Sequence, residues 1–327
     1  MDNLAHTLAG AALAEAGLKE KTGLGLATLM IAANLPDVDA VFAGADAGLA
    51  IRRGITHGPV GLIVLPILLT LAIVAFDRWQ ARRGKRPEGR LPVRPGWVLA
   101  LAYIGALSHP ALDWLNVYGV RCLAPFSDRW FYGDTLFIID VWLWTVLAIG
   151  TFLSQRRRRR GVAGPRTPAL AALGALVLYV GAMGFASHVA EARGTDAVIA
   201  AGYGTPDVMI ASPVPVNPFR REMIYRADGR IGFGEATFSP GLDLTLGAPP
   251  FPDGMDAPEI EAAAARSEKL RALLFWGRVP FAKIDRTTSG TRVVVTDARY
   301  SDSPNSGIFE AEVILPPSPS SVSEPPE

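Results

Sequence analysis

Long stretches without a charged side chain constrain this sequence more than any other feature. Residues 59–76, 95–112 and 167–190 contain no Asp, Glu, Lys or Arg and are 18, 18 and 24 residues long. A helix needs roughly 17 to 25 residues to cross the hydrocarbon core of a bilayer. Half of all residues are hydrophobic and only 19% are charged, which argues against a purely soluble protein. The sequence therefore predicts three membrane-spanning helices.

Three further segments are interrupted or short. Residues 135–155 form a fourth predicted span that contains a single charged residue, Asp140. Because a charge inside a membrane helix is costly, Asp140 is expected to have a function. Residues 4–18 and 23–42 are long enough only for short helices and are predicted to form a hairpin. We therefore expect an all-α multi-pass membrane domain of about six helices, two of them short, over residues 1–190.

The uneven distribution of Lys and Arg between the loops predicts the orientation. The turn at Lys19 and Lys21 carries two basic residues, loop 77–96 carries seven and loop 154–167 carries six. The two alternate loops, 43–58 and 117–134, carry four together. Basic loops face the cytoplasm, so six crossings of a bacterial-type inner membrane are predicted, with both termini outside. The Arg156–Arg160 run is then a topology anchor, and no nucleic-acid partner is expected.

After residue 190 the composition changes to frequent Gly and Pro with short β-like runs, Val293–Thr296 and Ile308–Leu315. Met223–Glu235 is typical of a hairpin that turns at Asp228-Gly229, and Glu261–Phe275 is typical of one helix. Residues 191–315 are therefore predicted to form a small extracytoplasmic α+β domain. The tail, residues 316–327, contains only Pro, Ser and Glu apart from Val322 and is expected to be disordered.

Imidazole and carboxylate side chains gather at one predicted depth of the membrane. With the orientation above, eight of them fall at the outer ends of predicted helices: His6, Asp37, Asp39, His57, His109, Asp113, Asp134 and Asp140. The basic residues that predict the orientation are independent of these eight positions. The convergence therefore predicts a metal site at the extracytoplasmic end of the helices.

His109 and Asp113 form the most informative pair. At positions i and i+4 of a helix they project from one face about 6 Å apart, and Asn116 extends the same stripe. Asp37 and Asp39 follow Pro36, which ends or kinks a helix, so either or both could point inward while one is structural. Other readings stay open: Asp37 and Asp39 could cap a turn, and Asp134 could cap a helix beginning at Thr135.

A single histidine near a helix end is usually an interfacial hydrogen-bonding residue, and His188, which has no neighbouring acid, is interpreted in that way. Imidazole together with carboxylate suits Zn²⁺, with Mn²⁺ or Fe²⁺ as alternatives. The predicted ligands, for one or two divalent ions with zinc first, are His6, Asp39, His57, His109, Asp113 and Asp134.

Six motifs resemble a known family. They are His6-Thr-Leu-Ala-Gly10, Asn34-Leu-Pro-Asp-Val-Asp39, Gly54-Ile-Thr-His-Gly58, the stretch from Ser108 to Gly119, Pro125-Phe-Ser127 and Phe137-Ile-Ile-Asp140. Over about residues 1–150 they resemble the YdjM-like predicted inner-membrane metal-dependent hydrolases. The order His6, Asp39, His57, His109, Asp113 is also remotely similar to that of zinc-dependent phospholipase C and P1-type nucleases. The later histidines and the glutamate of that superfamily are lacking here.

This resemblance implies phosphoester hydrolysis by metal-activated water. Asp113 is then a candidate bridge between two ions, Asp37 or Asp140 a candidate general base, and Arg121 or Arg129 a candidate phosphate ligand. A site near the lipid headgroups favours a lipid or lipid-linked phosphate as substrate. Two other functions remain open, a metal or proton transporter and a non-catalytic scaffold or sensor with a structural metal. The sequence does not indicate an oligomeric state.

Overall fold

The structure, a computed structural model, describes residues 1–288, 290–302 and 309–317 and divides into two compact units. The first unit comprises residues 1–40, 53–186 and 213–218, and the second comprises residues 41–52, 187–212 and the chain from 219 onwards. The predicted division at residue 190 lies inside helix α7, Thr167–Ala200. The predicted disordered tail has residues 318–327 outside the described part of the chain.

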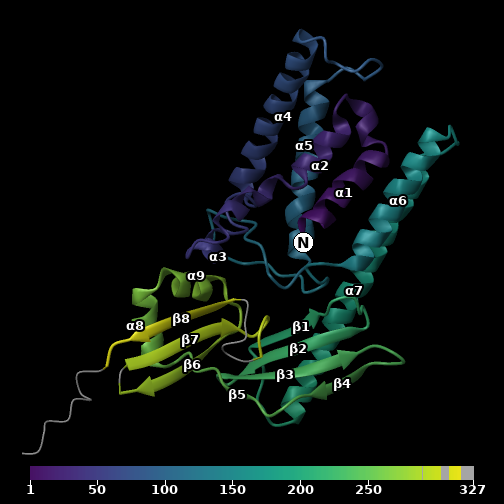
Figure 1. The fold of residues 1–327 in the computed structure, drawn as a ribbon. Coiled ribbons are helices and arrows are strands. Elements are labelled where there is room, and N and C mark those ends of the chain that lie inside the picture. The colour runs from purple at the N-terminus through teal and green to yellow at the C-terminus, as the bar shows by residue number, and fades with distance from the viewer. Residues whose placement is uncertain (289, 303–308, 318–327) are drawn as a thin grey trace, which may run out of the picture. The chain divides into compact units, whose positions relative to one another are not determined.

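Helices build the first unit. They are α1 (Asn3–Glu15), α2 (Gly25–Ala32), α4 (Pro59–Arg82), α5 (Pro95–Trp114) and α6 (Val141–Arg159), with the 3₁₀ helices η1 (Leu18–Lys21) and η2 (Leu35–Phe42) in the short-helix region. Figure 1 shows α1, α2, α4 and α5 side by side. Both α4 and α5 begin with Pro, whose fixed φ suits the first helical turn and whose missing N–H needs no partner there.

Small residues let the first helices approach closely. A Cβ added to Gly10 of α1 would lie 2.8 Å from the carbonyl oxygen of Leu29 in α2. A Cβ added to Gly105 of α5 would lie 2.7 Å from the Cβ of Ala32, also in α2. The backbone of α2 is therefore held directly against both α1 and α5, since any side chain at these two glycines would separate the helices.

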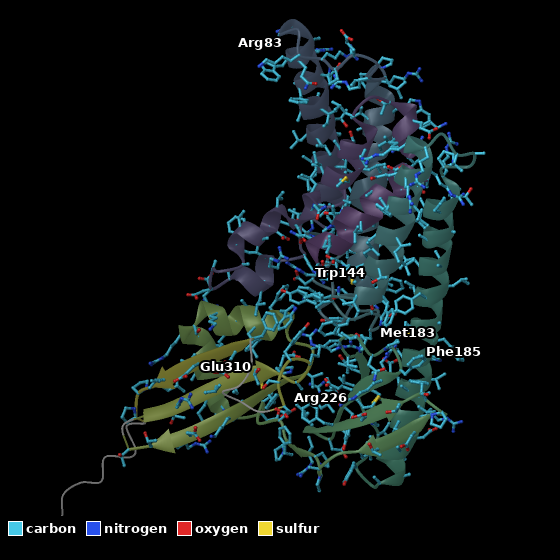
Figure 2. The ribbon with its side chains drawn as sticks, turned by 45° about the vertical axis from the view of Figure 1, so that its right-hand side comes forward. Arg83, Trp144, Met183, Phe185, Arg226 and Glu310 are labelled. Atoms are coloured by element: carbon cyan, nitrogen blue, oxygen red, sulfur yellow. The ribbon has the colours of Figure 1, made fainter. Side chains whose placement is uncertain are left out.

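One core cluster of this unit is made mainly of alanine and leucine. It contains Met1, the three alanines Ala5, Ala9 and Ala12 of α1, and six leucines, Leu112, Leu115, Leu136, Leu143, Leu147 and Leu176. Trp144 and Met183, both labelled in Figure 2, are partly buried against it. The alternation of small and large side chains follows from the close helix packing, because the large leucines fill the space that the alanines leave.

Two helices among the described residues, α4 and α7, are long and apolar enough to cross a membrane. Helix α2 and η2 together would make a third, bent by 41° at the break formed by residues 33 and 34, just before Pro36 of η2. The sequence prediction of six crossings stays a prediction. The predicted span 135–155 begins later than expected, because α6 starts at Val141.

Antiparallel sheets and short helices form the second unit. One sheet has the order β1 (Val208–Pro213), β2 (Arg220–Ala227), β3 (Arg230–Thr237) and β4 (Asp243–Leu246), with β5 (Phe251–Pro252) also paired to β3. The other has the order β6 (Pro280–Thr287), β7 (Gly290–Asp297) and β8 (Glu310–Leu315). The helices α3 (Gly48–Ile51), α8 (Pro258–Arg266) and α9 (Glu268–Trp276) belong to this unit.

The predicted hairpin is confirmed, with β2 paired to β3 across Asp228-Gly229. Both turn residues have positive φ, 49° and 66°, as a two-residue type I′ turn requires. The predicted single helix Glu261–Phe275 is wrong, because Ser267 has an extended backbone and separates α8 from α9. The Ser267 side chain accepts a hydrogen bond from the Leu270 N–H and so begins a new helix.

Candidate metal centre

Helix α5 supplies two of the site's side chains. His109 and Asp113 lie one turn apart, both fully buried, with His109 Nε2 3.4 Å from Asp113 Oδ2. The other ring nitrogen of His109, Nδ1, lies 2.6 Å from the carbonyl oxygen of Ala33, at the end of α2. The close packing of α2 on α5 therefore orients the imidazole as well as the helices.

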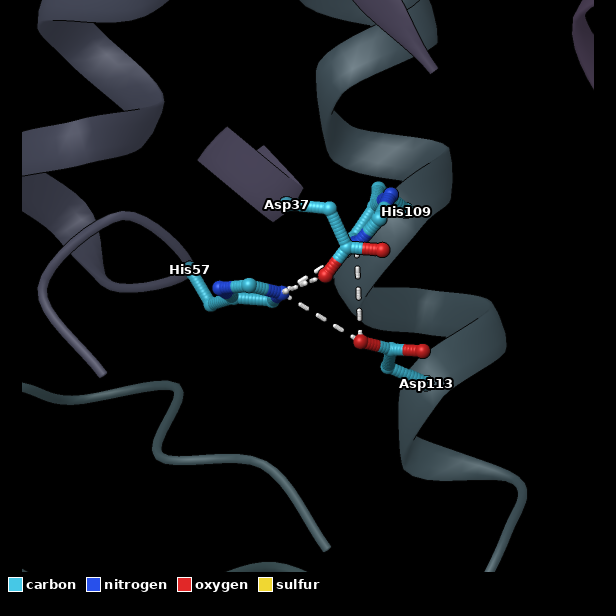
Figure 3. Close-up of side chains that lie close together, drawn as sticks. All are labelled: Asp37, His57, His109 and Asp113. Carbon is cyan, nitrogen blue, oxygen red and sulfur yellow. Dashed lines mark hydrogen bonds and ion pairs between the residues drawn. The ribbon is translucent and has the colours of Figure 1, made fainter. Parts of the chain in front are cut away.

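Two other segments complete the group. His57 ends a turn, in which its N–H donates to the Gly54 carbonyl, immediately before α4 begins. Its Nε2 lies 3.1 Å from His109 Nε2 and 3.3 Å from Asp113 Oδ2. Asp37, from η2, places Oδ1 3.7 Å from both Nε2 atoms. The four side chains point toward one another (Figure 3), and one ligand atom from each lies within 4.8 Å of all the others.

In the neutral form that binds a metal, the hydrogen bonds around each imidazole assign the proton to one of its two nitrogens. His109 Nδ1 faces a carbonyl oxygen, which can only accept, so Nδ1 is the donor and Nε2 carries a lone pair. The Thr56 hydroxyl donates to Asp39 Oδ2 at 2.9 Å, which leaves its oxygen to accept from His57 Nδ1 at 3.0 Å. His57 Nε2 therefore also carries a lone pair.

In these neutral tautomers two unprotonated nitrogens face each other at 3.1 Å, beside Asp113 Oδ2, a buried oxygen without a hydrogen-bond donor among the described residues. Lone pairs and a negative oxygen at such distances repel one another unless a cation lies between them. This donor set of two imidazoles and two carboxylates fits a divalent metal ion, and Asp37, His57, His109 and Asp113 form a candidate site for it.

Three of the four candidate ligand atoms lie closer to one another than the fourth lies to the two imidazole nitrogens. The distances between His57 Nε2, His109 Nε2 and Asp113 Oδ2 are 3.1, 3.3 and 3.4 Å. In a tetrahedral zinc site with bonds of roughly 2.0–2.1 Å, ligand atoms lie about 3.3 Å apart. These three atoms therefore match one face of a tetrahedron, whereas Asp37 Oδ1, at 3.7 Å, lies further out.

The second oxygen of Asp113 is held by positive and polar groups. Arg53 Nη2 lies 3.0 Å from Oδ1, the amine of Met1 also contacts it, and His6 Nε2 lies 3.3 Å away. Arg53 is itself fixed, since its Nη1 donates to Asn116 Oδ1 at 3.0 Å and to the Gly119 carbonyl at 3.1 Å. The carboxylate is therefore anchored through Oδ1, which leaves Oδ2 directed at the two imidazoles.

The predicted ligand His6 lies beside the group of four. Its ring stacks on that of His109, with the ring centres 3.7 Å apart and an interplanar angle of 16°. Both of its ring nitrogens are buried and have no hydrogen-bond partner in the described part of the chain. His6 therefore packs against a ligand residue, and only Nε2 approaches a carboxylate.

The predicted ligand Asp39 is not among the four residues of the group, whereas Asp37, predicted as a general base, is. Asp37 lies in the group of four, whereas Asp39 Oδ2 accepts hydrogen bonds from the Arg53 N–H at 2.8 Å and the Thr56 hydroxyl at 2.9 Å. Asp39 Oδ2 is also 3.4 Å from His57 Nδ1, the nitrogen on the far side of the ring from the group. Asp39 thus orients His57 and does not itself reach the candidate ion.

Asp140 and Asp134 lie outside the group of four. Asp140 precedes α6 as its N-cap, accepting from the Leu143 N–H at 2.8 Å and from the Tyr179 hydroxyl at 3.0 Å. The expectation of a charge inside a span is therefore wrong, since the helix begins one residue later. Asp134 is buried with φ 47°, and because no helix begins at Thr135, the alternative that it caps one there is also wrong.

The two predicted phosphate ligands lie on the connection between α5 and α6. The guanidinium of Arg121 lies 3.5 Å from Asp128 and 5.3 Å from the centre of the Trp130 ring, and burial lowers its pKa. The guanidinium of Arg129 lies 5.1 Å from the centre of the Phe131 ring and is exposed. Neither is among the four residues that surround the candidate ion.

Sequence reasoning did not assign Arg53 and Thr56 to the site. Both belong to the segment that leads into His57, and a hydroxyl directly before a histidine is a signal that could have been used. Arg53 was counted only as a charge that sets topology. Its neighbours Asn116 and Gly119 are distant in sequence, so its burial beside Asp113 could not be inferred from spacing.

A family comparison covers the part of the chain that carries this site. Residues 1–190 match the model of the YdjM inner membrane protein family. The chain belongs to the YdjM family. No curated protein and no solved structure matches it. All four residues of the candidate metal site lie in the matching part of this YdjM protein, which agrees with its apolar helices α4 and α7 in indicating an inner membrane protein.

Proposed function

We propose that this YdjM protein is a membrane-embedded, metal-dependent hydrolase that acts on a phosphoester in a lipid or lipid-linked substrate. The observation that carries the proposal is the arrangement of His57 Nε2, His109 Nε2 and Asp113 Oδ2 as one face of a tetrahedron. Two histidines and one carboxylate with a further position less tightly held are typical of hydrolytic zinc sites. Zinc is the expected ion, with manganese or iron as alternatives.

The ion, when bound, would acidify a water molecule and withdraw charge from a phosphoryl oxygen. Asp37 is placed to take up the proton, because its Oδ1 lies 3.7 Å from both imidazoles and it is less buried than the other three residues. Arg53 keeps Asp113 in the orientation that faces the imidazoles. Asp39 and Thr56 do the same for His57.

The position of the candidate ligands along the chain supports a lipid-borne substrate. His57 is two residues before Pro59, where α4, a helix long and apolar enough to cross a membrane, begins. The candidate site is therefore next to the end of such a helix, and if α4 crosses the membrane this end would lie near the lipid phosphates. The charge distribution of the loops supports the extracytoplasmic side.

A structural ion is the second candidate function, because all four ligand residues come from the protein and three are fully buried. Structural zinc sites are closed by four protein ligands, whereas catalytic sites keep a position for water or substrate. On this alternative Asp37 closes the site, and the metal joins η2 and α5 without any reaction.

The turnover of an Asp37→Asn variant distinguishes the metal-dependent hydrolase from the protein with a structural ion. The purified protein, loaded with zinc in detergent, is assayed on phosphatidylglycerol and on a chromogenic phosphodiester before and after removal of the metal by a chelator. Removing a general base should lower kcat by roughly 10²- to 10⁴-fold while one equivalent of zinc stays bound. His188→Gln, on an exposed histidine, is the matched control. Wild-type protein that binds zinc, is stabilised by it and hydrolyses neither ester would support the structural ion.

A further inference from the structure

The connection between α5 and α6 contains a closed loop, residues 120–131. Val120 and Phe131 close it by pairing as an isolated antiparallel bridge, with N–H···O distances of 3.0 and 2.9 Å. Within it, a tight turn brings the N–H groups of Phe126 and Ser127 to the Leu123 carbonyl at 2.9 and 3.2 Å. The 120–131 loop is therefore a defined piece of structure and presents its tip in a fixed conformation.

The tip of the 120–131 loop exposes apolar side chains. Phe126 is 77% exposed and Leu123 is 45% exposed. Arg129, on the returning side, is exposed with its guanidinium over the Phe131 ring. A large exposed aromatic and an exposed leucine are costly in water, but together with an arginine in the same loop they suit the boundary between lipid headgroups and hydrocarbon.

The 120–131 loop is fixed against the metal-site residues. The Arg121 N–H donates to the carbonyl oxygen of Arg53, the residue that anchors Asp113, at 2.9 Å. A Cβ added to Gly58 would lie 2.0 Å from the Ala124 carbonyl oxygen, so the loop backbone rests directly on Gly58. Gly58 stands between His57 and the first residue of α4. The loop is thus held where a candidate membrane helix ends and where the candidate metal site begins.

We infer that the 120–131 loop inserts Phe126 and Leu123 into the bilayer that holds the protein and guides a membrane phospholipid to the metal site. This inference rests on the proposed function for its second part. The apolar tip would contact acyl chains, and the Arg129 guanidinium would pair with the lipid phosphate. Leu123 and Phe126 are then specificity-determining residues, because they favour substrates that are anchored in the membrane over soluble esters.

Insertion can be measured without any turnover. A nitroxide label at Phe126→Cys, in the full chain with Cys122→Ser, is placed in vesicles of phosphatidylethanolamine and phosphatidylglycerol. Its collision rates with oxygen and with a water-soluble nickel chelate are compared with those of two reference labels. Leu178→Cys, on exposed apolar surface of α7, represents lipid, and Asp256→Cys, on exposed polar surface, represents water. An oxygen-to-nickel ratio nearer the Leu178 label supports insertion, and one nearer the Asp256 label overturns it.

Substrate guidance is measured with Phe126→Ser. The ratio of kcat/KM on phosphatidylglycerol to kcat/KM on the chromogenic phosphodiester should fall about ten-fold, because burial of the ring in lipid is lost. Phe152→Ser removes an equally large ring that is 61% exposed on α6, and should leave this ratio unchanged. A ratio that Phe126→Ser does not alter would refute guidance. A wild-type protein inactive on both esters, with a lipid-exposed label at 126, would refute the proposed function and leave insertion standing.

Discussion

Replacing Asp39 by Asn tests whether this carboxylate orients a ligand or is one. Asp39 Oδ2 accepts from the Arg53 N–H and the Thr56 hydroxyl and lies 3.4 Å from His57 Nδ1. The amide oxygen of Asn can still accept from the Arg53 N–H and the Thr56 hydroxyl, so residues 53–57 should keep their conformation. The negative charge of Asp39 near His57 Nδ1 makes Nε2 a stronger metal ligand, and the substitution removes this charge.

We therefore expect the Asp39→Asn change to affect zinc affinity as the loss of a residue that orients a metal-binding histidine does. Such changes weaken metal binding about 10- to 100-fold, which corresponds to about 1.4–2.7 kcal/mol. Binding is measured by competition with a chromophoric zinc chelator, on purified protein in detergent at neutral pH. The Asp39→Asn protein should still take up one equivalent of zinc when the ion is in excess. His57→Ala, which removes a ligand atom, should not.

Asp256→Asn, a change of the same chemistry at an exposed position, is the control and should bind zinc as the wild type does. Two results would refute the reasoning. If Asp39→Asn cannot be saturated with zinc, Asp39 is itself a ligand, as the sequence had suggested. If its affinity equals that of the wild type, the carboxylate has no influence on His57, and the hydrogen-bond pattern that fixes the imidazole proton is wrong.

Three other changes have defined outcomes. His109→Ala should abolish stoichiometric zinc in elemental analysis, whereas His188→Ala should not, and equal metal contents would remove the most secure ligand. Gly58→Ala places a methyl 2.0 Å from a loop carbonyl oxygen and should lower both the melting temperature and zinc affinity, whereas unchanged values would show that the loop is not in contact. Burial opposes the charge of Asp297, but Arg299 beside it and N–H donors hold its pKa below the ordinary value. Its stabilising contribution is therefore present above the unfolded pKa of about 3.9 and is lost as the pH falls through the lower folded value, so Asp297→Asn should flatten the acid side of the stability profile measured by circular dichroism.

The sequence was sufficient where a short-range rule controls the structure. The spacing of His109 and Asp113 placed both on one face of a helix, and α5 contains them one turn apart. Asp228-Gly229 has the backbone freedom that a two-residue hairpin turn needs, and the hairpin forms there. In each case neighbouring residues in the chain are enough to determine the outcome.

The sequence was insufficient where distant contacts decide. Pro36 lies in the first turn of a 3₁₀ helix with three residues per turn, so Asp37 and Asp39 point in different directions. Which of them meets the histidines depends on Arg53 and Thr56, which bind Asp39 from a separate segment. The start of α6 likewise depends on Leu115, whose carbonyl receives the N–H groups of residues 135 and 136 and keeps them out of the helix.

The glycines at the helix contacts also determine the chemistry of the site. Gly105 lies one turn before His109, and by bringing α2 against α5 it sets the distance from the Ala33 carbonyl to the imidazole and, through the following η2, from Asp37 to His109. A methyl group at position 105 would change no ligand and no charge. It would nevertheless move two parts of the candidate metal site apart, so that the geometry of the site depends on a hydrogen atom in the middle of a helix.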